Sequence, residues 1–403
     1  MKILVLLPRF PYPLDKGDKL RAYHQLVELA KRHEVHLFAM SHEAVGEAQV
    51  EALRPHSKSI YVERLHAPAI WWGVLRAFLK GQSLQLGYWT TRRAQRHYHA
   101  FEQQVQPDVV YCQMVRTLPT VTGSPYRKVL DFQDALSLNT RRRMERAHGL
   151  WRLILNYEEK ALKRAEQEAL RLFNATTIIS PIDRDAISPA ITLVPNGVDT
   201  DYFKGERLKV KSETADVVDD SHLSPLTSHL SPHAIVFTGN MAYAPNVDAA
   251  RYLVEEVMPL VWERCPYANV LLAGADPKPA VKALAGPKVT VSGRLDDIRT
   301  AYASTQLFVA PMRIGSGMQN KLLEAMSMGL PCVTTSIAAT PLGAIPGEHL
   351  LVGDNAAELA TLIASLLTDS WQQQQLADAG HRFVQERYSW PAAVAPLEAI
   401  LTN

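Results

Sequence analysis

The sequence predicts an α/β protein of two doubly wound domains, each built on a parallel sheet. Short apolar runs alternate with longer segments whose apolar residues recur at helical spacing, which is typical of successive βαβ units. The chain has 403 residues, more than one hydrophobic core usually supports, so two domains are expected. The alternation is interrupted at residues 206–233, where a polar stretch without periodicity predicts a flexible insertion at a domain boundary.

The first domain opens with a βαβ unit. Residues 2–8 are a short apolar run ending in proline, residues 18–31 carry a helical apolar stripe, and residues 35–40 are a second run. Such a unit places its two strands in parallel. The connecting loop contains Gly17, which allows a tight turn, but it lacks the G-x-G-x-x-G pattern of dinucleotide-binding proteins. An NAD-dependent oxidoreductase is therefore disfavoured.

The rest of the first domain continues the same pattern. A charged segment at residues 150–173 predicts a long helix. Further strands are expected at residues 59–65, 109–113, 129–132, 176–180 and 192–195.

A segment that mixes aromatic and basic residues spans residues 69–101. Between Arg64 and Arg152 the chain has 14 Lys and Arg residues but 5 Asp and Glu residues. Aromatic and basic residues on a helix surface suit an anionic membrane interface, so we expect peripheral contact with the inner membrane through this segment. The alternative is that the tryptophans belong to the core and the arginines are solvated. No RNA-binding motif is present, and nucleic-acid binding is disfavoured.

Two aspartates, Asp131 and Asp134, lie at the end of the strand predicted at residues 129–132. Ligands of parallel sheets bind outside the carboxyl ends of the strands, so Asp134 is placed to meet a substrate. Its alternative role is to cap the next helix. We expect Asp131 to turn inward or to cap.

The second domain repeats the alternation more clearly. Its longest helix is expected at residues 246–263, and its strands at residues 235–239, 270–274, 289–293, 307–311, 331–335 and 350–352. We assign residues 1–195 to the first domain, 196–233 to a linker with the insertion, and 234–380 to the second domain. Residues 381–403 are expected to form C-terminal helices that return to the first domain.

A glycine loop followed by a short helix is the strongest candidate site. Gly315 and Gly317 flank Ser316, which lets the backbone approach a ligand closely. The N-terminus of the following helix attracts anions such as phosphate, and Lys321 adds a positive charge. Glu324 lies on the same helical face and can accept hydrogen bonds from two hydroxyl groups of a polyol. Phosphate and ribose sites side by side predict a nucleotide-binding site.

Composition narrows the class of protein. The formal net charge is +2, which does not suggest a nucleic-acid binder. The three cysteines, Cys112, Cys265 and Cys332, lie far apart in apolar surroundings, which indicates buried thiols in a reducing compartment. The apolar N-terminal run is too short for a secretory signal, and no segment is long enough to span a membrane. We therefore predict a cytoplasmic protein, with peripheral contact to the inner membrane face.

These motifs together resemble the GT-B glycosyltransferases, in particular glycosyltransferase family 4, the retaining enzymes of bacterial exopolysaccharide and lipopolysaccharide assembly. The resemblance rests on the loop around Gly17 and on four further motifs in the expected order. These are VPNGVDTDYF at residues 194–203, the stretch with SGRLDDI and LFVAP at residues 289–311, NKLLEAMSMGLPCVTT at residues 320–335, and RYSW at residues 387–390. It implies two Rossmann-like domains that face each other across a cleft.

The resemblance also implies roles for single residues. Glu324 matches the ribose-binding glutamate, and the backbone of Arg294 and Leu295 is expected near the base. Arg313 and Lys321 are expected to neutralise the diphosphate, with the backbone from Gly315 onward near the donor sugar. The list of expected donor-binding residues is Gly17, Asn240, Arg294, Leu295, Arg313, Gly315, Ser316, Gly317, Lys321 and Glu324, and the expected catalytic residue is Asp134.

The sequence departs from the family pattern at three of its polar positions. Ser316 stands where the family has a second glutamate, Asn240 where it has an arginine, and Gln133 where it has a histidine. The expected reaction moves a sugar from a nucleotide-sugar donor to a saccharide or lipid-linked acceptor, with no metal and no other cofactor. The departures leave two alternatives open, a nucleotide-sugar epimerase of the same fold and a catalytically weak nucleotide-binding relative.

Overall fold

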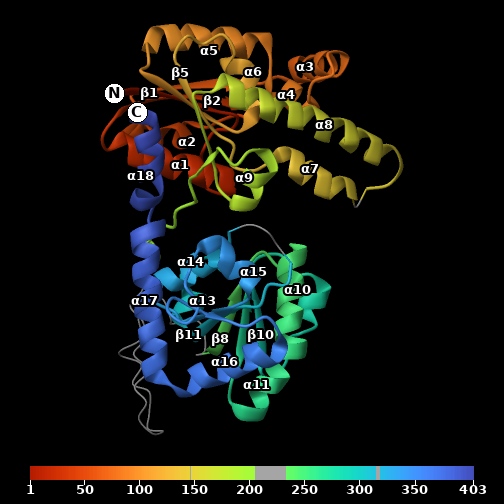
Figure 1. The fold of residues 1–403 in the computed structure, drawn as a ribbon, viewed down its shortest axis with the longest axis vertical. Helices are drawn as coiled ribbons and strands as arrows, with labels where there is room; N and C mark the ends of the chain where they lie inside the picture. Colours follow the sequence, from red (N-terminus) through yellow and green to blue (C-terminus); the bar gives the residue numbers. More distant parts are fainter. Residues whose placement is uncertain (146, 205–232, 315–317) are drawn as a thin grey trace. The chain divides into compact units, whose positions relative to one another are not determined.

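The computed structural model describes residues 1–145, 147–204, 233–314 and 318–403. They form two compact units, unit 1 (Met1–Gly197 with Trp390–Asn403) and unit 2 (Val198–Ser389) (Figure 1). Each unit holds a parallel sheet covered by helices, so the predicted α/β class with two doubly wound sheets is confirmed. The insertion expected at residues 206–233 lies, apart from His233, outside the described residues.

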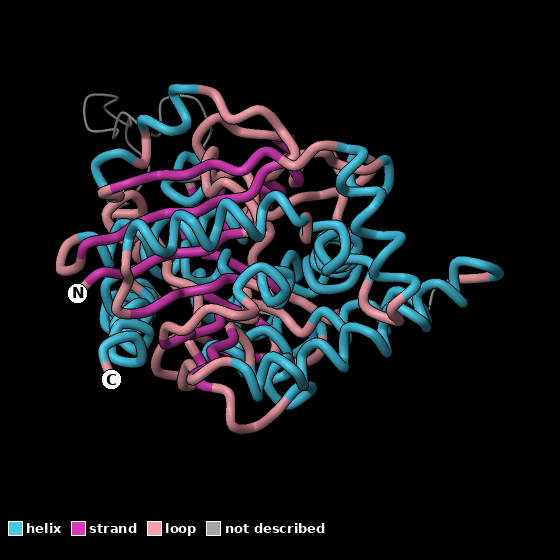
Figure 2. The backbone as a smooth tube through the Cα atoms, turned by 90° about the horizontal axis from the view of Figure 1, so that it is seen from above, coloured by secondary structure: helices cyan, strands magenta, loops and turns pink. Residues whose placement is uncertain are grey.

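The described part of unit 1 contains a seven-stranded parallel sheet in the order β3-β2-β1-β4-β5-β6-β7; the magenta tubes in Figure 2 show strands running side by side. Its strands are β1 (Lys2–Leu7), β2 (Glu34–Ser41), β3 (Ser59–Arg64), β4 (Val109–Gln113), β5 (Arg127–Asp131), β6 (Ala175–Ile178) and β7 (Thr192–Leu193). Its helices include α1 (Gly17–Ala30), α2 (Glu47–Glu51), α3 (Ala67–Leu79), α4 (Leu84–Trp89), α5 (Arg92–Val105), α6 (Leu118–Val121), α7 (Leu136–Glu145), α8 (Gly149–Leu172), α9 (Pro181–Ile187) and α18 (Trp390–Thr402).

The apolar run of β1 is explained by burial on both faces of this sheet. Leu4 and Leu6 point into one core, with α5 and α8, whereas Val5 and Leu7 point into the other, with α1 and α18. Successive side chains of a strand alternate between faces, so a strand covered on both sides is apolar throughout.

The described part of unit 2 contains a six-stranded parallel sheet in the order β10-β9-β8-β11-β12-β13. Its strands are β8 (His233–Thr238), β9 (Val270–Ala273), β10 (Val289–Gly293), β11 (Thr305–Ala310), β12 (Cys332–Thr334) and β13 (Leu351–Val352). Its helices include α10 (Ala244–Tyr252), α11 (Met258–Arg264), α12 (Pro279–Lys282), α13 (Arg299–Ala303), α14 (Asn320–Ser327), α15 (Ser336–Ala339), α16 (Ala356–Thr368) and α17 (Ser370–Tyr388). The helix predicted at residues 246–263 is interrupted by one π-helical segment, Leu253–Val257.

The C-terminal helices divide between the units. Helix α17 packs on α14 in unit 2, whereas α18 packs on α1 in unit 1, where Trp390 stacks on His24 with ring centroids 4.6 Å apart. Helix α17 ends at Tyr388 and α18 begins at Trp390. Pro391 occupies the first turn of α18, where a missing N–H costs nothing.

Both sheets reverse their strand order once. The reversal falls between β1 and β4 in unit 1, and between β8 and β11 in unit 2. At such a point the two connections leave in opposite directions and open a crevice outside the carboxyl ends of the strands, which is where ligands of this architecture bind.

Candidate functional site

A group of polar residues lies at the reversal point of unit 2, where β8 and β11 end. We call it the Lys321–Glu324 cluster, and it consists of Phe237, Thr238, Asn246, Tyr302, Met312, Lys321 and Glu324. Lys321 and Glu324 both belong to α14, in its first two turns, as the sequence predicted.

Lys321 is held at this point by neutral groups. Its Nζ donates to Oδ1 of Asn246 at 2.5 Å, lies 3.9 Å from Sδ of Met312, and sits 4.8 Å from the centroid of the Phe237 ring. Burial lowers the pKa of the Lys321 ammonium to about 8, and the charge of Glu324 opposes this fall. Among the described residues no carboxylate forms an ion pair with Lys321, so its charge is available to an anionic ligand.

Glu324 is anchored through one of its two oxygens. The Tyr302 hydroxyl donates to Oε2 of Glu324 at 2.8 Å, and it lies 2.9 Å from Oγ1 of Thr238. Burial raises the pKa of the Glu324 carboxyl, whereas the Tyr302 hydroxyl and the Lys321 charge favour its ionised form. No described residue bonds to Oε1, which leaves this oxygen to accept a ligand hydroxyl.

Two glycines let the loops after β8 and β9 approach closely. A Cβ on Gly274 would lie 1.8 Å from the carbonyl oxygen of Gly239, and a Cβ on Gly239 would lie 2.6 Å from Nδ2 of Asn246. Both glycines have positive φ angles, 148° for Gly274 and 154° for Gly239. The close approach brings the buried Asn246 amide under the loop, where it donates to the carbonyl of Asn240 and accepts from Lys321.

Sequence reasoning missed Asn246 and Tyr302. Asn246 is predicted only as the start of a helix, and no role is predicted for Tyr302. A polar side chain within a buried helix face requires a partner, and this signal could have identified Asn246.

Three other predicted donor residues lie on loops of unit 2. The Asn240 side chain accepts from the backbone of Ala242 at 2.8 Å, so it stabilises its own loop. Arg294 is exposed and Leu295 is partly buried against the core. Within the described part of the chain neither residue forms a backbone hydrogen bond, so their N–H and C=O groups are available to the edge of a base.

Arg313 contacts residues that lie outside the Lys321–Glu324 cluster. Its guanidinium bonds to both oxygens of Asp248, at 2.8 and 3.1 Å, and to Glu256 at 3.2 Å, and it stacks 4.2 Å from the Tyr252 ring centroid. The charge of Arg313 is therefore compensated by Asp248 and Glu256. To bind a diphosphate, Arg313 would have to break these ion pairs. Gly315, Ser316 and Gly317 lie outside the described residues.

In unit 1, Asp134 stands exposed just beyond β5. Its carboxylate forms no hydrogen bond with a described residue, and the backbone N–H of Ala135 is instead satisfied by Asp183 at 3.3 Å. The capping alternative for Asp134 is therefore not supported. Protein atoms around the Asp134 carboxyl remove part of its water, and the carboxylates of Asp183 and Asp131 lie nearby. Both effects raise the pKa of the Asp134 carboxyl, to about 6.

Gly17 begins α1 and has open space where a Cβ would be, with a backbone that other residues also adopt. The tight turn expected from Gly17 is therefore wrong. Its predicted donor contact remains a prediction. A small pocket lies next to the start of α1, lined by Leu7, Pro8, Arg9, Asp18, Lys19, Ala22, Gln113, Met114 and Gln133.

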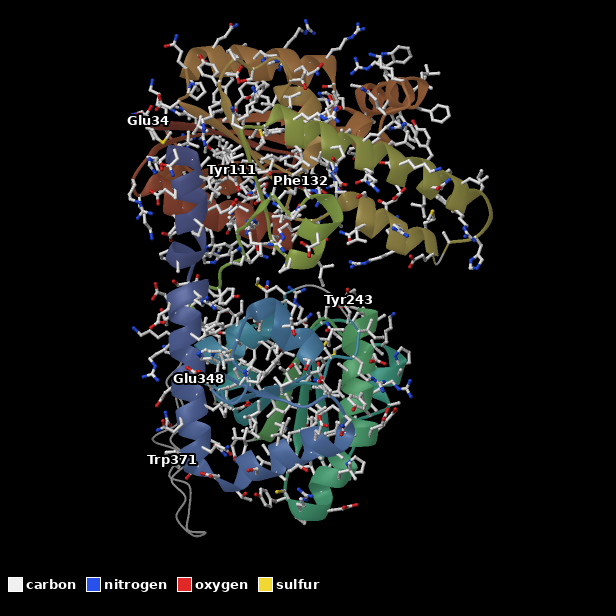
Figure 3. All side chains as sticks on the ribbon, in the orientation of Figure 1. Glu34, Tyr111, Phe132, Tyr243, Glu348 and Trp371 are labelled. Carbon is white, nitrogen blue, oxygen red and sulfur yellow. The ribbon has the colours of Figure 1, made fainter. Side chains whose placement is uncertain are left out.

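Beneath this pocket runs a buried network that sequence reasoning missed. Asp131 turns inward, as predicted, and pairs with Nε of Arg21 at 2.6 Å. The Arg21 guanidinium also donates to the carbonyls of Val194 and Pro195 and to Oδ1 of Asn196, each at 2.9 Å. The network continues from Asp131 through Tyr111, Gln25, Gln113 and Gln133. Figure 3 labels Tyr111 within unit 1. An inward aspartate on a buried strand demands a cationic partner, which was the available signal for Arg21.

We also searched the described residues for a metal site and for membrane-spanning helices. The described residues contain no group of three or more His, Cys, Asp or Glu side chains arranged to hold a metal ion. None of their helices combines the length and apolar character needed to cross a bilayer. The three cysteines are buried and belong to no disulfide, as predicted.

Comparison with known proteins relates the second sheet of the chain to a family. The family model described as glycosyl transferases group 1 matches residues 232–369, which include the Lys321–Glu324 cluster. This part of the chain is therefore similar to group 1 glycosyl transferases. The whole chain is 21% identical to a 44.6 kDa protein in the cps region of Klebsiella pneumoniae, over 96% of each chain.

Solved structures share their fold with this chain along its length. Sucrose-phosphate synthase from Thermosynechococcus elongatus superposes with a TM-score of 0.65 at 14% identity, covering 99% of this chain and 98% of the other. Anabaena HepE in complex with UDP superposes with a TM-score of 0.65 at 16% identity, covering 100% of both chains. The similarity supports the predicted GT-B fold.

Proposed function

We propose that this protein is a retaining glycosyltransferase of family 4 that transfers a sugar from a nucleotide-diphosphate donor to a saccharide or lipid-linked acceptor in bacterial polysaccharide assembly. The observation that carries the proposal is the pair Lys321 and Glu324, held by neutral partners at the reversal point of the matched domain. The relative from a cps region and the UDP complex of HepE support the polysaccharide context and the nucleotide-sugar donor.

In this proposal Lys321 and the N-terminus of α14 stabilise the diphosphate. The bond between the anomeric carbon and the phosphate oxygen breaks, and negative charge accumulates on the leaving diphosphate. A fixed ammonium and backbone dipoles stabilise that charge without reorganising, and removal of one such donor commonly costs about 3 kcal/mol of the activation barrier. No metal is required by this assignment.

Glu324 binds the ribose and Asp134 acts on the acceptor. The anchored carboxylate of Glu324 accepts hydrogen bonds from the ribose hydroxyls through its open oxygen. Asp134 orients or deprotonates the acceptor hydroxyl, whose oxygen forms the new bond to the anomeric carbon. A carboxylate with a pKa near 6 is ionised and still moderately basic at neutral pH, which suits this role.

The test is calorimetric titration of the full chain with UDP, GDP, their sugar conjugates and the free nucleosides. We expect one family of nucleotide sugars to bind, and Glu324→Ala to weaken nucleoside and nucleoside diphosphate by a similar factor. Exposed Glu348→Ala is the matched control and is expected to change neither affinity. Unchanged nucleoside affinity in Glu324→Ala would contradict the ribose assignment, and conversion of the donor without any acceptor would indicate an epimerase.

A further inference from the structure

Helix α3 is apolar on two faces, only one of which is packed. Ile70, Gly73 and Ala77 are buried, and α3 packs on α4 so closely that a Cβ on Gly73 would lie 2.3 Å from the carbonyl oxygen of Gly87. The opposite face is exposed. It carries Trp71, Trp72, Leu75, Phe78 and Leu79, with 47–74% of each residue accessible.

The first two turns of α8 continue this exposed apolar surface. Leu150, Trp151 and Leu153 are 66–71% exposed. Tyr157 lies one turn further along, with its ring tilted against that of Phe78 and the two centroids 5.6 Å apart. Its hydroxyl donates to the carbonyl of Gln82 at 2.9 Å, so α8 lies against the C-terminal end of α3. Figure 1 shows α7 and α8 extending together from the sheet of unit 1, with α3 nearby. We call the exposed residues of α3 and of the start of α8 the α3–α8 surface.

Basic residues accompany this surface, and acidic ones are absent from its helical turns. The segment from Ala67 to Leu79 contains Arg76 and no acidic residue, and Lys80 follows it directly. The segment from Gly149 to Tyr157 contains Arg152 and no acidic residue. A helix that is apolar all round is normally buried or in contact with lipid, and tryptophan is enriched at the boundary between lipid and water.

We infer that the α3–α8 surface docks on an anionic lipid bilayer, with the tryptophans at headgroup depth and Arg76, Lys80 and Arg152 facing lipid phosphates. The positive charge favours an anionic bilayer over an uncharged protein surface. This assignment replaces the expectation that residues 69–101 as a whole contact the membrane. Trp89 is buried in the core, and α5 buries Tyr98 and Phe101. The alternative that the tryptophans are core residues holds for Trp89 but is wrong for Trp71 and Trp72, which are exposed. The inference does not rest on the proposed function, since binding is measured without sugar transfer.

The experiment is co-sedimentation of the full chain with vesicles of phosphatidylcholine and phosphatidylglycerol, compared with vesicles of phosphatidylcholine alone. We expect binding to the anionic vesicles that weakens as salt rises. Trp71→Ser and Trp151→Ser are each expected to lower the partition coefficient about tenfold, since each removes one large apolar side chain from the contact. The double variant is expected to lose about a hundredfold, because the two sites are separate.

The matched control is Trp371→Ser. Trp371 is 71% exposed at the start of α17 in unit 2 and is labelled in Figure 3. Its replacement is expected to leave vesicle binding unchanged, and all three tryptophans are exposed enough that the variants should fold, which circular dichroism checks. Failure of the native chain to bind anionic vesicles would overturn the inference, as would equal losses in Trp371→Ser. A native dimer that dissociates in Trp71→Ser, seen by light scattering without lipid, would identify a second copy as the occupant and overturn it as well.

Discussion

The carboxyl edges of the two sheets hold their charges in different ways. In unit 1 the buried Asp131 is neutralised by Arg21, which also donates three hydrogen bonds to backbone and side-chain oxygens of residues 194–196. In unit 2 Lys321 is held by the amide of Asn246, and Glu324 by the hydroxyl of Tyr302. A charge compensated within the protein stabilises the fold, whereas a charge held by neutral groups keeps its attraction for a ligand.

The same contrast exists within unit 2. Arg313 and Lys321 were both expected to bind the diphosphate, yet Arg313 is paired with two carboxylates and Lys321 with none that the structure describes. In unit 1 the contrast is between Asp131, which is paired, and Asp134, which is not. Partner chemistry therefore separates structural from functional charges better than position in the sequence does.

The largest expected effect comes from breaking the buried pair of unit 1. Arg21→Met leaves Asp131 buried without a cation, and we expect the free energy of unfolding to fall by about 3–5 kcal/mol in chemical denaturation. Arg9→Ala is the control, because its ion pair with Asp18 is partly exposed and is worth about 1 kcal/mol or less. If Arg21→Met lost no more stability than Arg9→Ala, the contrast between the edges would fail. Adding Asp131→Leu to Arg21→Met should restore part of the loss.

The next effect sharpens the contrast between the two cations of unit 2. Lys321→Ala is expected to weaken nucleoside diphosphate binding by about 1.5–3 kcal/mol, roughly 10- to 100-fold, because a charged hydrogen bond is lost. The free nucleoside should lose much less affinity. Arg313→Ala is expected to have the smaller effect of the two, and calorimetry distinguishes them. Equal losses for nucleoside and diphosphate in Lys321→Ala would remove its phosphate role.

The pH dependence tests the open carboxylate of unit 1. The pKa of Asp134 is raised to about 6, so its ionised form, which accepts a proton, is lost as the pH falls through 6. We expect the transfer rate to fall about tenfold per pH unit below this value, measured as kcat/KM. Asp134→Asn should reduce the rate and abolish this limb of the profile. A limb that persists in Asp134→Asn would assign the titration to another group.

The smallest expected effect is that of Gly17→Ala at the edge of unit 1, which we compare with Gly274→Ala at the edge of unit 2. Gly17→Ala meets open space in the first turn of α1, so we expect the free energy of unfolding to change by about 1 kcal/mol or less. Gly274→Ala would clash with the Gly239 carbonyl at a positive φ angle, and we expect a loss of more than about 2 kcal/mol. Thermal unfolding compares the two variants. Gly17→Ala should still lower donor affinity, and unchanged affinity would contradict its predicted donor contact.

Most strands and helices could be predicted from the sequence, because the spacing of apolar residues is a local property of each segment. Strands β4 and β10 coincide with their predicted ranges, and α8 differs from its predicted range by one residue at each end. The spacing of apolar residues within a segment indicates which of its side chains are buried and whether the segment is a strand or a helix. The placement of Lys321 and Glu324 on one short helix followed from the same spacing.

The amino-acid sequence by itself determined the two parallel sheets, the position of α14 and the inward turn of Asp131. Only the tertiary structure decided the partners: Asn246 for Lys321, Tyr302 for Glu324, Arg21 for Asp131, and solvent for Trp71 and Trp151. The physical reason is that hydrogen bonding and exposure depend on which segments the strand order brings together. Arg21 and Asp131 are 110 positions apart, and no periodic pattern joins residues across such a distance.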